Sequence, residues 1–437
     1  MRKKVLAFCD SPTAPTGFGK VAQEILGLVH KYYDVDITVW GINHDGSSDE
    51  RFTIIASMLE GSKERDQQDP LMNRNAFCKY IYNNDFDVFW SVQDAFNMQT
   101  ISQALLRKKA VGRVFKSIFY FPVDVAQIPD TWCKTAMSFD TPVTYTNFAR
   151  EQLTRHVSAE AMKRVGIAYH GTNTDNFFPM PEKDVLQFRK EELHLYGNQF
   201  LFMNLNKNQF RKDIPTTMFA FQFFMEWWKE QGYKTPPPKL LLHMMPNAMA
   251  GENLAMIRDT FMPDVADHIL FPDYPPKGFT TEDINMFYNA ADCLISSSLG
   301  EGWGLTTTES MCAKLPVIVP NNTVNPEIIG DNAERGALVA SGFGPNGYWN
   351  WKWIDGCSQY GDPPRPVTSV ISLASHMKKV FLDCTDENGN RLPAPKEGTE
   401  THKRVEAAYS WARGLTWESI FDASWRKVFD SCLDRRA

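Results

Sequence analysis

The sequence predicts an α/β protein made of two Rossmann-like domains that face a cleft. Strand patterns alternate with helical patterns along the 437 residues, which favours parallel sheets with helices on both faces. A polar stretch with prolines at 171–183 interrupts this series, and the series then starts again. Each half opens with a strand and an unusual loop, as expected where a parallel sheet binds a ligand at the carboxyl ends of its strands.

The strand and helix patterns can be placed in order along both halves. The first half begins with a buried strand, a loop rich in proline and glycine, and a helix with apolar residues at helical spacing. Its strands are predicted at 5–9, 35–40, 87–92, 117–121, 143–145 and 165–169. The second half begins with a strand, a basic loop and a helix that starts near Pro215. Its strands are predicted at 199–206, 239–244, 269–271, 293–297 and 317–319.

Two segments near the C-terminus fall outside this series. Residues 342–366 are predicted to form a loop that is rich in aromatic residues. Its part from Tyr348 to Trp353 could stack on a sugar ring or a base, or could pack against the second domain, and both remain open. Residues 417–433 are predicted to form a helix with bulky aromatic side chains on one face, which requires a large partner surface.

Composition excludes several classes of protein. Hydrophobic residues make up 43% and charged residues 22%, which are values of globular rather than disordered or fibrous chains. No stretch approaches the ~20 apolar residues that span a bilayer, so no membrane insertion is expected. The net charge of -6 excludes a generally basic surface for nucleic acid but allows a local basic cleft. Eight scattered cysteines without a C-x-x-C pair fit a reducing compartment, and we expect a cytoplasmic protein.

The strongest chemical signal is the segment 301–309, E-G-W-G-L-T-T-T-E. It places Glu301 and Glu309 on the two sides of a glycine-rich turn that enters a helix. The glycines let the backbone approach a ligand closely, and backbone N–H groups at the helix start are available to a phosphate. The alternative interpretation is a capped helix with solvated carboxylates.

The second signal is the basic loop 206–212, N-K-N-Q-F-R-K, between a strand and a helix. The cations Lys207, Arg211 and Lys212 could donate charge-assisted hydrogen bonds to a diphosphate. Taken alone, the same loop could simply be solvated.

The third signal is the segment 16–20, T-G-F-G-K, after the first strand. Gly17 and Gly19 at a helix start allow close approach of a phosphate or a sugar. The segment lacks the third glycine of the dinucleotide fingerprint, and the sequence contains no P-loop. A dinucleotide-dependent dehydrogenase is therefore disfavoured.

Together these motifs resemble those of retaining glycosyltransferases of family four, also called glycosyl transferases group 1, which have the GT-B fold. That family carries the pattern E-G-[FW]-G-L-x-x-x-E, as at 301–309. The segments 170–173, 288–292, 310–318 and 325–328 also resemble family elements. The resemblance covers most of 160–340, whereas the first half matches only around 16–20 and 121–124. Similar sequences are met in bacteria and bacteriophages.

The resemblance implies roles for individual residues. Glu309 would hold the ribose hydroxyls of a nucleotide sugar, and Glu301 would bond a hydroxyl of the donor sugar. Lys207 and Lys212 would clamp the diphosphate, with Arg211 as a competitor for that role. The turn and helix start would contact sugar and phosphate through Gly302, Trp303, Gly304, Leu305 and Thr306. Gly17 and Gly19 would contact the diphosphate from the N-terminal domain. The segment 271–274 matches the region that meets the base.

The resemblance also implies an organisation of domains. Residues 1–175 would form an acceptor domain, and residues 185–400 would form the domain that binds the nucleotide sugar. Residues 404–437 would form a C-terminal helix that packs back on the first domain.

One departure from the family concerns the strand at 117–121. Many members have a histidine after this strand, and here the chain continues with Pro122, Val123 and Asp124. Asp124 could orient a donor hydroxyl or accept the acceptor's proton, or it could cap the following turn. No enzymic nucleophile, permanently bound cofactor or metal is required, because protein cations would stabilise the leaving diphosphate.

The nature of the acceptor and of the nucleotide is not fixed by these motifs. UDP is the favoured nucleotide, and GDP remains open. Candidate acceptors are hydroxymethylated pyrimidine in phage DNA, for which the location would be the host cytoplasm, or a glycan, a protein or a small molecule. A nucleotide-sugar epimerase and a non-catalytic nucleotide-sugar-binding module remain as alternative functions.

Overall fold

The computed structural model describes residues 2–58, 69, 71–275, 278–343, 350–352 and 363–436. The chain divides into two compact units. The first contains Met1–Gly171 and Trp417–Ala437, and the second contains Thr172–Thr416. Within the described ranges, no helix has the length and apolar character needed to cross a membrane.

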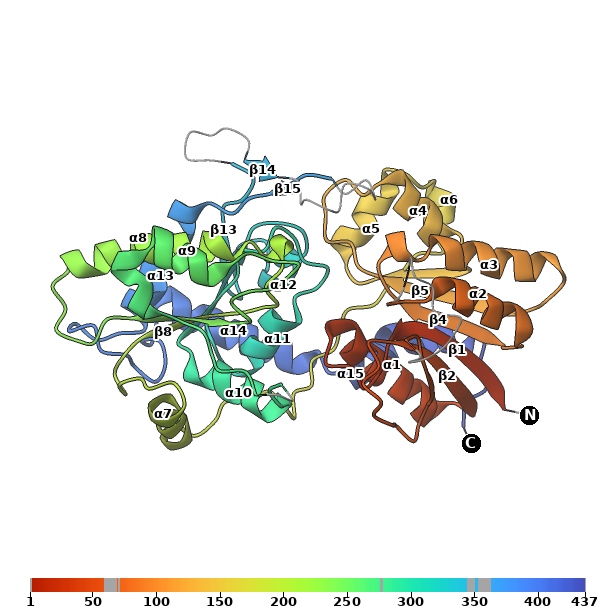
Figure 1. Cartoon of the computed structure of the whole chain (residues 1–437), viewed down its shortest axis with the longest axis horizontal. Helices are drawn as coiled ribbons and strands as arrows, with labels where there is room; N and C mark the ends of the chain where they lie inside the picture. The colour runs from red at the N-terminus through yellow and green to blue at the C-terminus, as the bar shows by residue number, and fades with distance from the viewer. Residues whose placement is uncertain are drawn as a thin grey trace. The chain divides into compact units, whose positions relative to one another are not determined.

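The first unit is built on a seven-stranded parallel sheet with the strand order β3-β2-β1-β4-β5-β6-β7 (Figure 1). Its strands are β1 (Lys3–Asp10), β2 (Val35–Ile42), β3 (Thr53–Ala56), β4 (Val88–Val92), β5 (Lys116–Phe121), β6 (Thr141–Thr144) and β7 (Gly166–Ile167). Its helices are α1 (Gly17–Tyr32), α2 (Arg74–Asn83), α3 (Gln99–Ala110), α4 (Asp130–Met137), α5 (Asn147–Thr154) and α6 (Ala159–Met162). The chain order reverses between β1 and β4, which is the place where open α/β sheets bind ligands.

The turn from β1 into α1 explains why glycine is needed there. Thr16 caps α1 by accepting a hydrogen bond from the N–H of Gly19 at 3.0 Å, which satisfies a donor that the helix leaves free. A Cβ atom on Gly19 would lie 2.5 Å from the carbonyl oxygen of Ala14 and 2.7 Å from that of Ser11. Gly19 therefore allows the loop to fold tightly over the helix start.

The C-terminal segment belongs to the first unit. It consists of α15 (Trp417–Ile420), a π-helical turn (Phe421–Trp425) and α16 (Arg426–Asp430), and it lies among the elements of that unit in Figure 1. The ring of Trp425 packs edge-on against Tyr120 at 4.8 Å and against Trp90 at 6.5 Å. The aromatic face predicted for 417–433 is thus buried on the first sheet.

Residues 404–437 do not form the single helix on the first unit that the sequence predicts. Residues up to Gly414 belong to α14 (Glu400–Gly414), which lies in the second unit and contacts α11 (Leu305–Cys312). The chain passes into the first unit only after Thr416. The physical reason is that α14 buries its own apolar residues, including Val405 and Ala408, within the second unit.

The second unit is built on a six-stranded parallel sheet with the order β10-β9-β8-β11-β12-β13. Its strands are β8 (Leu201–Leu205), β9 (Lys239–His243), β10 (Ile269–Leu270), β11 (Cys293–Ile295), β12 (Val317–Pro320) and β13 (Ala337–Val339). Besides α11 and α14, its helices are α7 (Glu182–Glu191), α8 (Ile214–Glu230), α9 (Leu254–Phe261), α10 (Thr281–Ala290), α12 (Asn325–Ile329) and α13 (Val370–Asp383). Packed phenylalanines fill the core between this sheet and its helices, among them Phe202, Phe224 and Phe381.

A small hairpin follows the second sheet. Strand β14 (Trp351–Lys352) pairs antiparallel with β15 (Arg365–Pro366). The sequence predicts a loop for 342–366, so these strands are a correction. Beside them, Val367 donates its N–H to the carbonyl of Asn350 at 2.9 Å, which holds the two segments together. Tyr348, Trp349 and Trp353 of the predicted aromatic segment lie outside the described residues, whereas Trp351 lies in β14.

Candidate active site

The turn after β11 brings the glutamate motif to the carboxyl edge of the second sheet. Gly304 has a φ of +96°, and α11 begins at the next residue, Leu305. A left-handed backbone at this point favours glycine. The turn reverses the chain between the strand and the helix, so Glu301 lies before the turn and Glu309 lies in the second turn of α11.

Glu301 joins the glutamate motif to the basic loop. Its Oε1 accepts a hydrogen bond from Lys212 Nζ at 2.5 Å, and its Oε2 lies 3.2 Å from Arg211 Nη1. The side chains of Glu301 and Lys212 are only 13% and 12% exposed. Burial alone would raise the pKa of Glu301, but the charges of Lys212 and Arg211 outweigh it and lower that pKa to about 2. Glu301 is therefore ionised at neutral pH.

The backbone of the basic loop is fastened to the segment that follows β11. Ser297 Oγ donates to the carbonyl oxygen of Asp213 at 2.8 Å, and Leu299 donates its N–H to the carbonyl of Arg211 at 2.9 Å. Ser297 is also hydrogen-bonded to Thr217 on α8 at 2.7 Å. These bonds fix Arg211 and Lys212 before any ligand binds, which limits the entropy that binding would cost.

Lys207 differs from the other two cations. Its side chain is exposed, and no hydrogen bond or ion pair joins it to another of the described residues. Arg211 also donates to the carbonyl of Gly300, so its guanidinium is oriented by the turn itself. The loop thus offers two anchored cations and one exposed cation.

Glu309 is buried in the second turn of α11. It is 6% exposed, and its Oε2 accepts a hydrogen bond from the hydroxyl of Tyr288 on α10 at 2.9 Å. Burial and the charge of Glu309 raise the pKa of Tyr288 well above its usual value, so the phenol stays protonated and acts as the donor. Tyr288 was not identified as a site residue from the sequence, although it lies in the segment 288–292 that resembles the family.

The start of α11 supplies backbone donors. The first N–H groups of a helix have no partner within the helix, which applies to Leu305 and Thr306. The N–H of Thr307 instead donates to the carbonyl of Gly304 at 3.0 Å. Gly302 is half-buried and Trp303 is buried, so the indole packs inward and leaves the backbone of the turn at the edge of the sheet.

Three of the predicted residues lie in the first unit. Gly17 is the first residue of α1 and is exposed, whereas Gly19 is buried under the loop described above. Asp124 follows β5 and is half-buried. All three lie at the carboxyl edge of their own sheet, which is the binding edge of an open α/β sheet.

The segment predicted to meet the base lies after β10. The hydroxyl of Tyr274 is 3.3 Å from Nδ1 of His243, which ends β9. Burial lowers the pKa of His243 to about 4, so its imidazole is neutral at pH 7. Phe279 and Phe287 pack on His243 with ring centroids at 4.8 Å and 4.4 Å, and an aromatic wall results at this end of the sheet.

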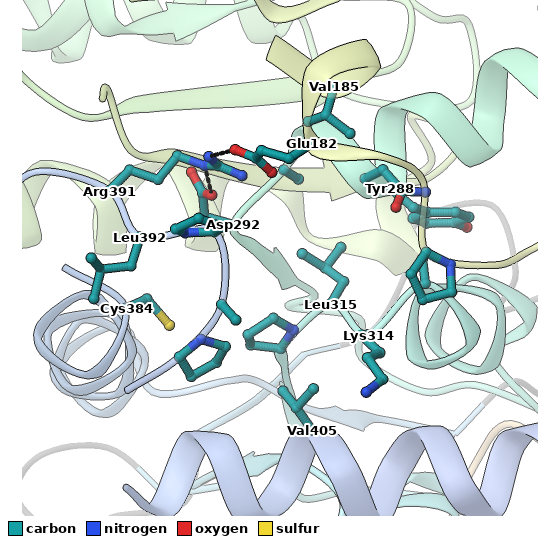
Figure 2. A pocket seen from close by; sticks show the side chains of 18 of the residues that line it. Glu182, Val185, Tyr288, Asp292, Lys314, Leu315, Cys384, Arg391, Leu392 and Val405 are labelled. Carbon is teal, nitrogen blue, oxygen red and sulfur yellow. Dashed lines mark hydrogen bonds and ion pairs between the residues drawn. The ribbon is translucent and has the colours of Figure 1, made fainter. Parts of the chain in front are cut away.

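A separate pocket of about 270 Å³ opens at the amino ends of β11 and β12, on the opposite edge of this sheet (Figure 2). Figure 2 shows Arg391 reaching both Asp292 and Glu182, with Nε–Oδ1 and Nη1–Oε1 distances of 2.5 Å and 2.6 Å. Tyr288 lines this pocket while its hydroxyl bonds Glu309. In the part of the chain that is described, no group of three or more His, Cys, Asp or Glu side chains could hold a metal ion.

Comparison with known proteins places this geometry in a family. The family model described as glycosyl transferases group 1 matches residues 276–344, which contain both Glu301 and Glu309. The chain has the GT-B fold, and its segment 276–344 is that of a group 1 glycosyltransferase. This assignment confirms the predicted family, enzyme class and α/β architecture with two Rossmann-like sheets. The group 1 pattern therefore coincides with the edge where the structure gathers Glu301, Arg211 and Lys212.

Solved structures resemble this chain over nearly its whole length. A sucrose-phosphate synthase from Thermosynechococcus elongatus is 16% identical, with a TM-score of 0.66 over 98% of this chain and 100% of that chain. A glycosyltransferase from Rickettsia africae is 16% identical, with a TM-score of 0.63 over 97% and 96%. A UDP-forming α,α-trehalose-phosphate synthase from Burkholderia vietnamiensis is 10% identical, with a TM-score of 0.63 over 97% and 96%. None of the curated protein sequences matches the chain significantly.

Proposed function

We propose that this glycosyltransferase moves a sugar from a nucleoside-diphosphate sugar to a hydroxyl acceptor with retention of configuration. The observation that carries the proposal is the cluster of Glu301, Arg211 and Lys212 at the carboxyl edge of the second sheet. Two cations and a helix start match the negative charge of a diphosphate there, and the buried carboxylate can accept a hydrogen bond from a sugar hydroxyl. Residues 185–400 then form the donor domain, and residues 1–175 form the acceptor domain.

The cations act on the leaving group. Negative charge builds up on the nucleoside diphosphate as the bond to the sugar breaks, and Lys212, Arg211 and Lys207 stabilise it together with the start of α11. These groups supply the positive charge that a metal ion supplies in other enzymes, so the proposed reaction needs no metal. The departing phosphate takes up the acceptor's proton, and the chain contributes no nucleophile.

Glu301 changes its partners in this proposal. When the diphosphate binds, Lys212 and Arg211 turn part of their hydrogen bonds to the phosphate oxygens. The carboxylate of Glu301, which these two cations keep ionised in the free protein, can then accept a hydrogen bond from a donor-sugar hydroxyl. Glu309 accepts hydrogen bonds from the ribose hydroxyls, with Tyr288 holding one of its oxygens in place.

The donor nucleotide is proposed to be a uridine nucleotide. The support is the similarity in fold to a trehalose-phosphate synthase that is named as UDP-forming. Tyr274 and the neutral His243 lie where the base would be bound, and both can donate or accept one hydrogen bond to a pyrimidine edge.

The acceptor edge of the first unit is acidic among its described residues. Asp10, Asp45, Asp94 and Asp124 end or follow the strands β1, β2, β4 and β5 there. These carboxylates would repel a polyanion at ordinary salt. Nothing in the described residues therefore supports hydroxymethylated DNA as the acceptor, and we favour an uncharged hydroxyl compound.

Loss of Glu309 tests the donor site. In titration calorimetry with UDP, GDP and ADP, we expect one diphosphate to bind wild-type protein, and Glu309→Ala to weaken that binding about 10- to 100-fold. The reason is the loss of hydrogen bonds from ribose hydroxyls to a charged acceptor, worth about 1.5–3 kcal/mol.

The matched control is Glu406→Ala. Glu406 is a half-exposed carboxylate of the same unit that pairs with Lys314 at 2.8 Å, and its loss should leave the affinity unchanged. Binding of no nucleotide by folded wild-type protein, or equal affinities of wild type and Glu309→Ala, would contradict the proposed donor site.

A further inference from the structure

Lys352 of the hairpin β14–β15 forms an ion pair next to the basic loop. Lys352 on β14 donates from Nζ to Oδ1 of Asp213 at 2.5 Å. Lys352 is 40% exposed, whereas the side chain of Asp213 is only 5% exposed. The two residues are 139 positions apart in the sequence, so the contact is made by the fold and not by local structure.

Asp213 places a negative charge beside Lys212 and Arg211, the two cations that are proposed to bind the diphosphate. It directly follows Lys212 and has a φ of +48°, a left-handed conformation that is uncommon outside glycine. Its Oδ2 accepts a hydrogen bond from Thr216 Oγ1 at 2.8 Å. The carboxylate is therefore buried at the start of α8, one residue from the cation that the proposed function assigns to the diphosphate.

An uncompensated carboxylate at this position would weaken the clamp. Its negative charge would lower the positive potential that attracts the phosphates, and the effect is strong because the site is shielded from water. It would also offer Lys212 a partner that competes with the ligand. Lys352 balances the charge of Asp213 by its ion pair. Lys212 therefore keeps its hydrogen bond to Glu301 at the carboxyl edge of the sheet.

We propose that Lys352 is a positioning residue for the donor diphosphate, which acts by neutralising Asp213 and so keeps Lys212 available. The inference rests on the proposed function, because it presumes that Lys212 binds a diphosphate. It extends that function to the hairpin after the second sheet, which no motif of the donor site includes.

Lys352 can be replaced without changing the conformation of the basic loop. The carbonyls of Arg211 and Asp213 are held by Leu299 and Ser297, and neither bond involves the hairpin. The expected defect of Lys352→Met is therefore electrostatic. It should disappear when the charge of Asp213 is removed as well, by Asp213→Asn.

The test is a double-mutant cycle on the full chain. Wild type, Lys352→Met, Asp213→Asn and the double variant are titrated with the nucleoside diphosphate that wild type binds, and with the corresponding monophosphate. We expect Lys352→Met to weaken diphosphate binding about tenfold and monophosphate binding less, and the double variant to return to within about threefold of wild type. Lys352→Arg should bind like wild type, and melting temperatures verify that each variant is folded.

The outcomes separate this inference from the proposed function. Unchanged diphosphate affinity in Lys352→Met, or a double variant as weak as Lys352→Met, overturns the role of Lys352 and leaves the donor site intact. Wild-type protein that binds none of UDP, GDP and ADP overturns the donor site and this inference with it.

Discussion

Replacing Lys212 by alanine is expected to lower kcat by at least about 100-fold, with a much smaller change in the KM for the donor. Lys212 is nearly buried beside Glu301, so its charge acts across a short distance and with little screening. The diphosphate gains most of its charge in the transition state, and a contact that strengthens there appears in kcat rather than in KM. Steady-state kinetics with the nucleotide sugar measures both quantities.

The matched control for this variant is Lys229→Ala. Lys229 lies in the last turn of α8, the helix that follows the basic loop, and its side chain is exposed. We expect wild-type kinetics from it. In Lys212→Ala, a fall in kcat of only a few-fold, or a raised KM with kcat unchanged, would contradict this role, since the latter result means that Lys212 binds the ground state and the transition state equally.

Replacing Asp292 by alanine is expected to destabilise the second unit by about 3–5 kcal/mol, because it removes the carboxylate that faces the buried Arg189 and one of the two that face Arg391. Asp292 accepts hydrogen bonds from Arg391 Nε at 2.5 Å and from the N–H of Leu201 at 2.7 Å, and lies 3.3 Å from Arg189 Nη1. Arg189 is fully buried, and burial lowers its pKa while Asp292 counteracts that effect. For a unit of this size the loss corresponds to a fall in melting temperature of roughly 10 °C.

Calorimetric melting of the variant measures this loss, and Glu182→Ala is its control. Glu182 binds the same Arg391 at 2.6 Å but is 39% exposed, and ion pairs near the surface contribute about 0–1 kcal/mol. A melting temperature of Asp292→Ala within a degree or two of wild type would contradict the structural role that Figure 2 indicates for this network.

Much of the fold could be predicted because parallel strands that are buried on both faces appear as continuous apolar runs. The strand predicted at 5–9 is the core of β1 (Lys3–Asp10), and the helix predicted near Pro215 is α8. Strands β3 (Thr53–Ala56) and β13 (Ala337–Val339) were missed: β3 is only partly buried, and β13 has only three residues, so neither shows a long apolar run. The short strand β14 (Trp351–Lys352) lacks a pattern for the same reason.

The candidate site could be predicted where its residues are close in sequence. The segments 206–212 and 301–309 each carry their chemistry locally, and their joining through Glu301 follows once both lie at the carboxyl edge of one sheet. Contacts between distant residues could not be predicted. The bond from Tyr288 to Glu309 and the ion pair of Lys352 with Asp213 depend on how α10 and the hairpin pack, and no spacing in the sequence indicates either.

The claim that the chain transfers a sugar with retention is tested most directly by following the turnover of nucleotide sugars by NMR. Water serves as the acceptor, so the reaction observed is hydrolysis of the donor. UDP-, GDP- and ADP-sugars are incubated with wild type and Lys212→Ala. We predict slow release of one nucleoside diphosphate by wild type, a first-formed sugar with the anomeric configuration of the donor, and no release by Lys212→Ala. A rearranged sugar would identify an epimerase, an inverted product would exclude retention, and no reaction with any donor would contradict the transferase mechanism proposed for this chain.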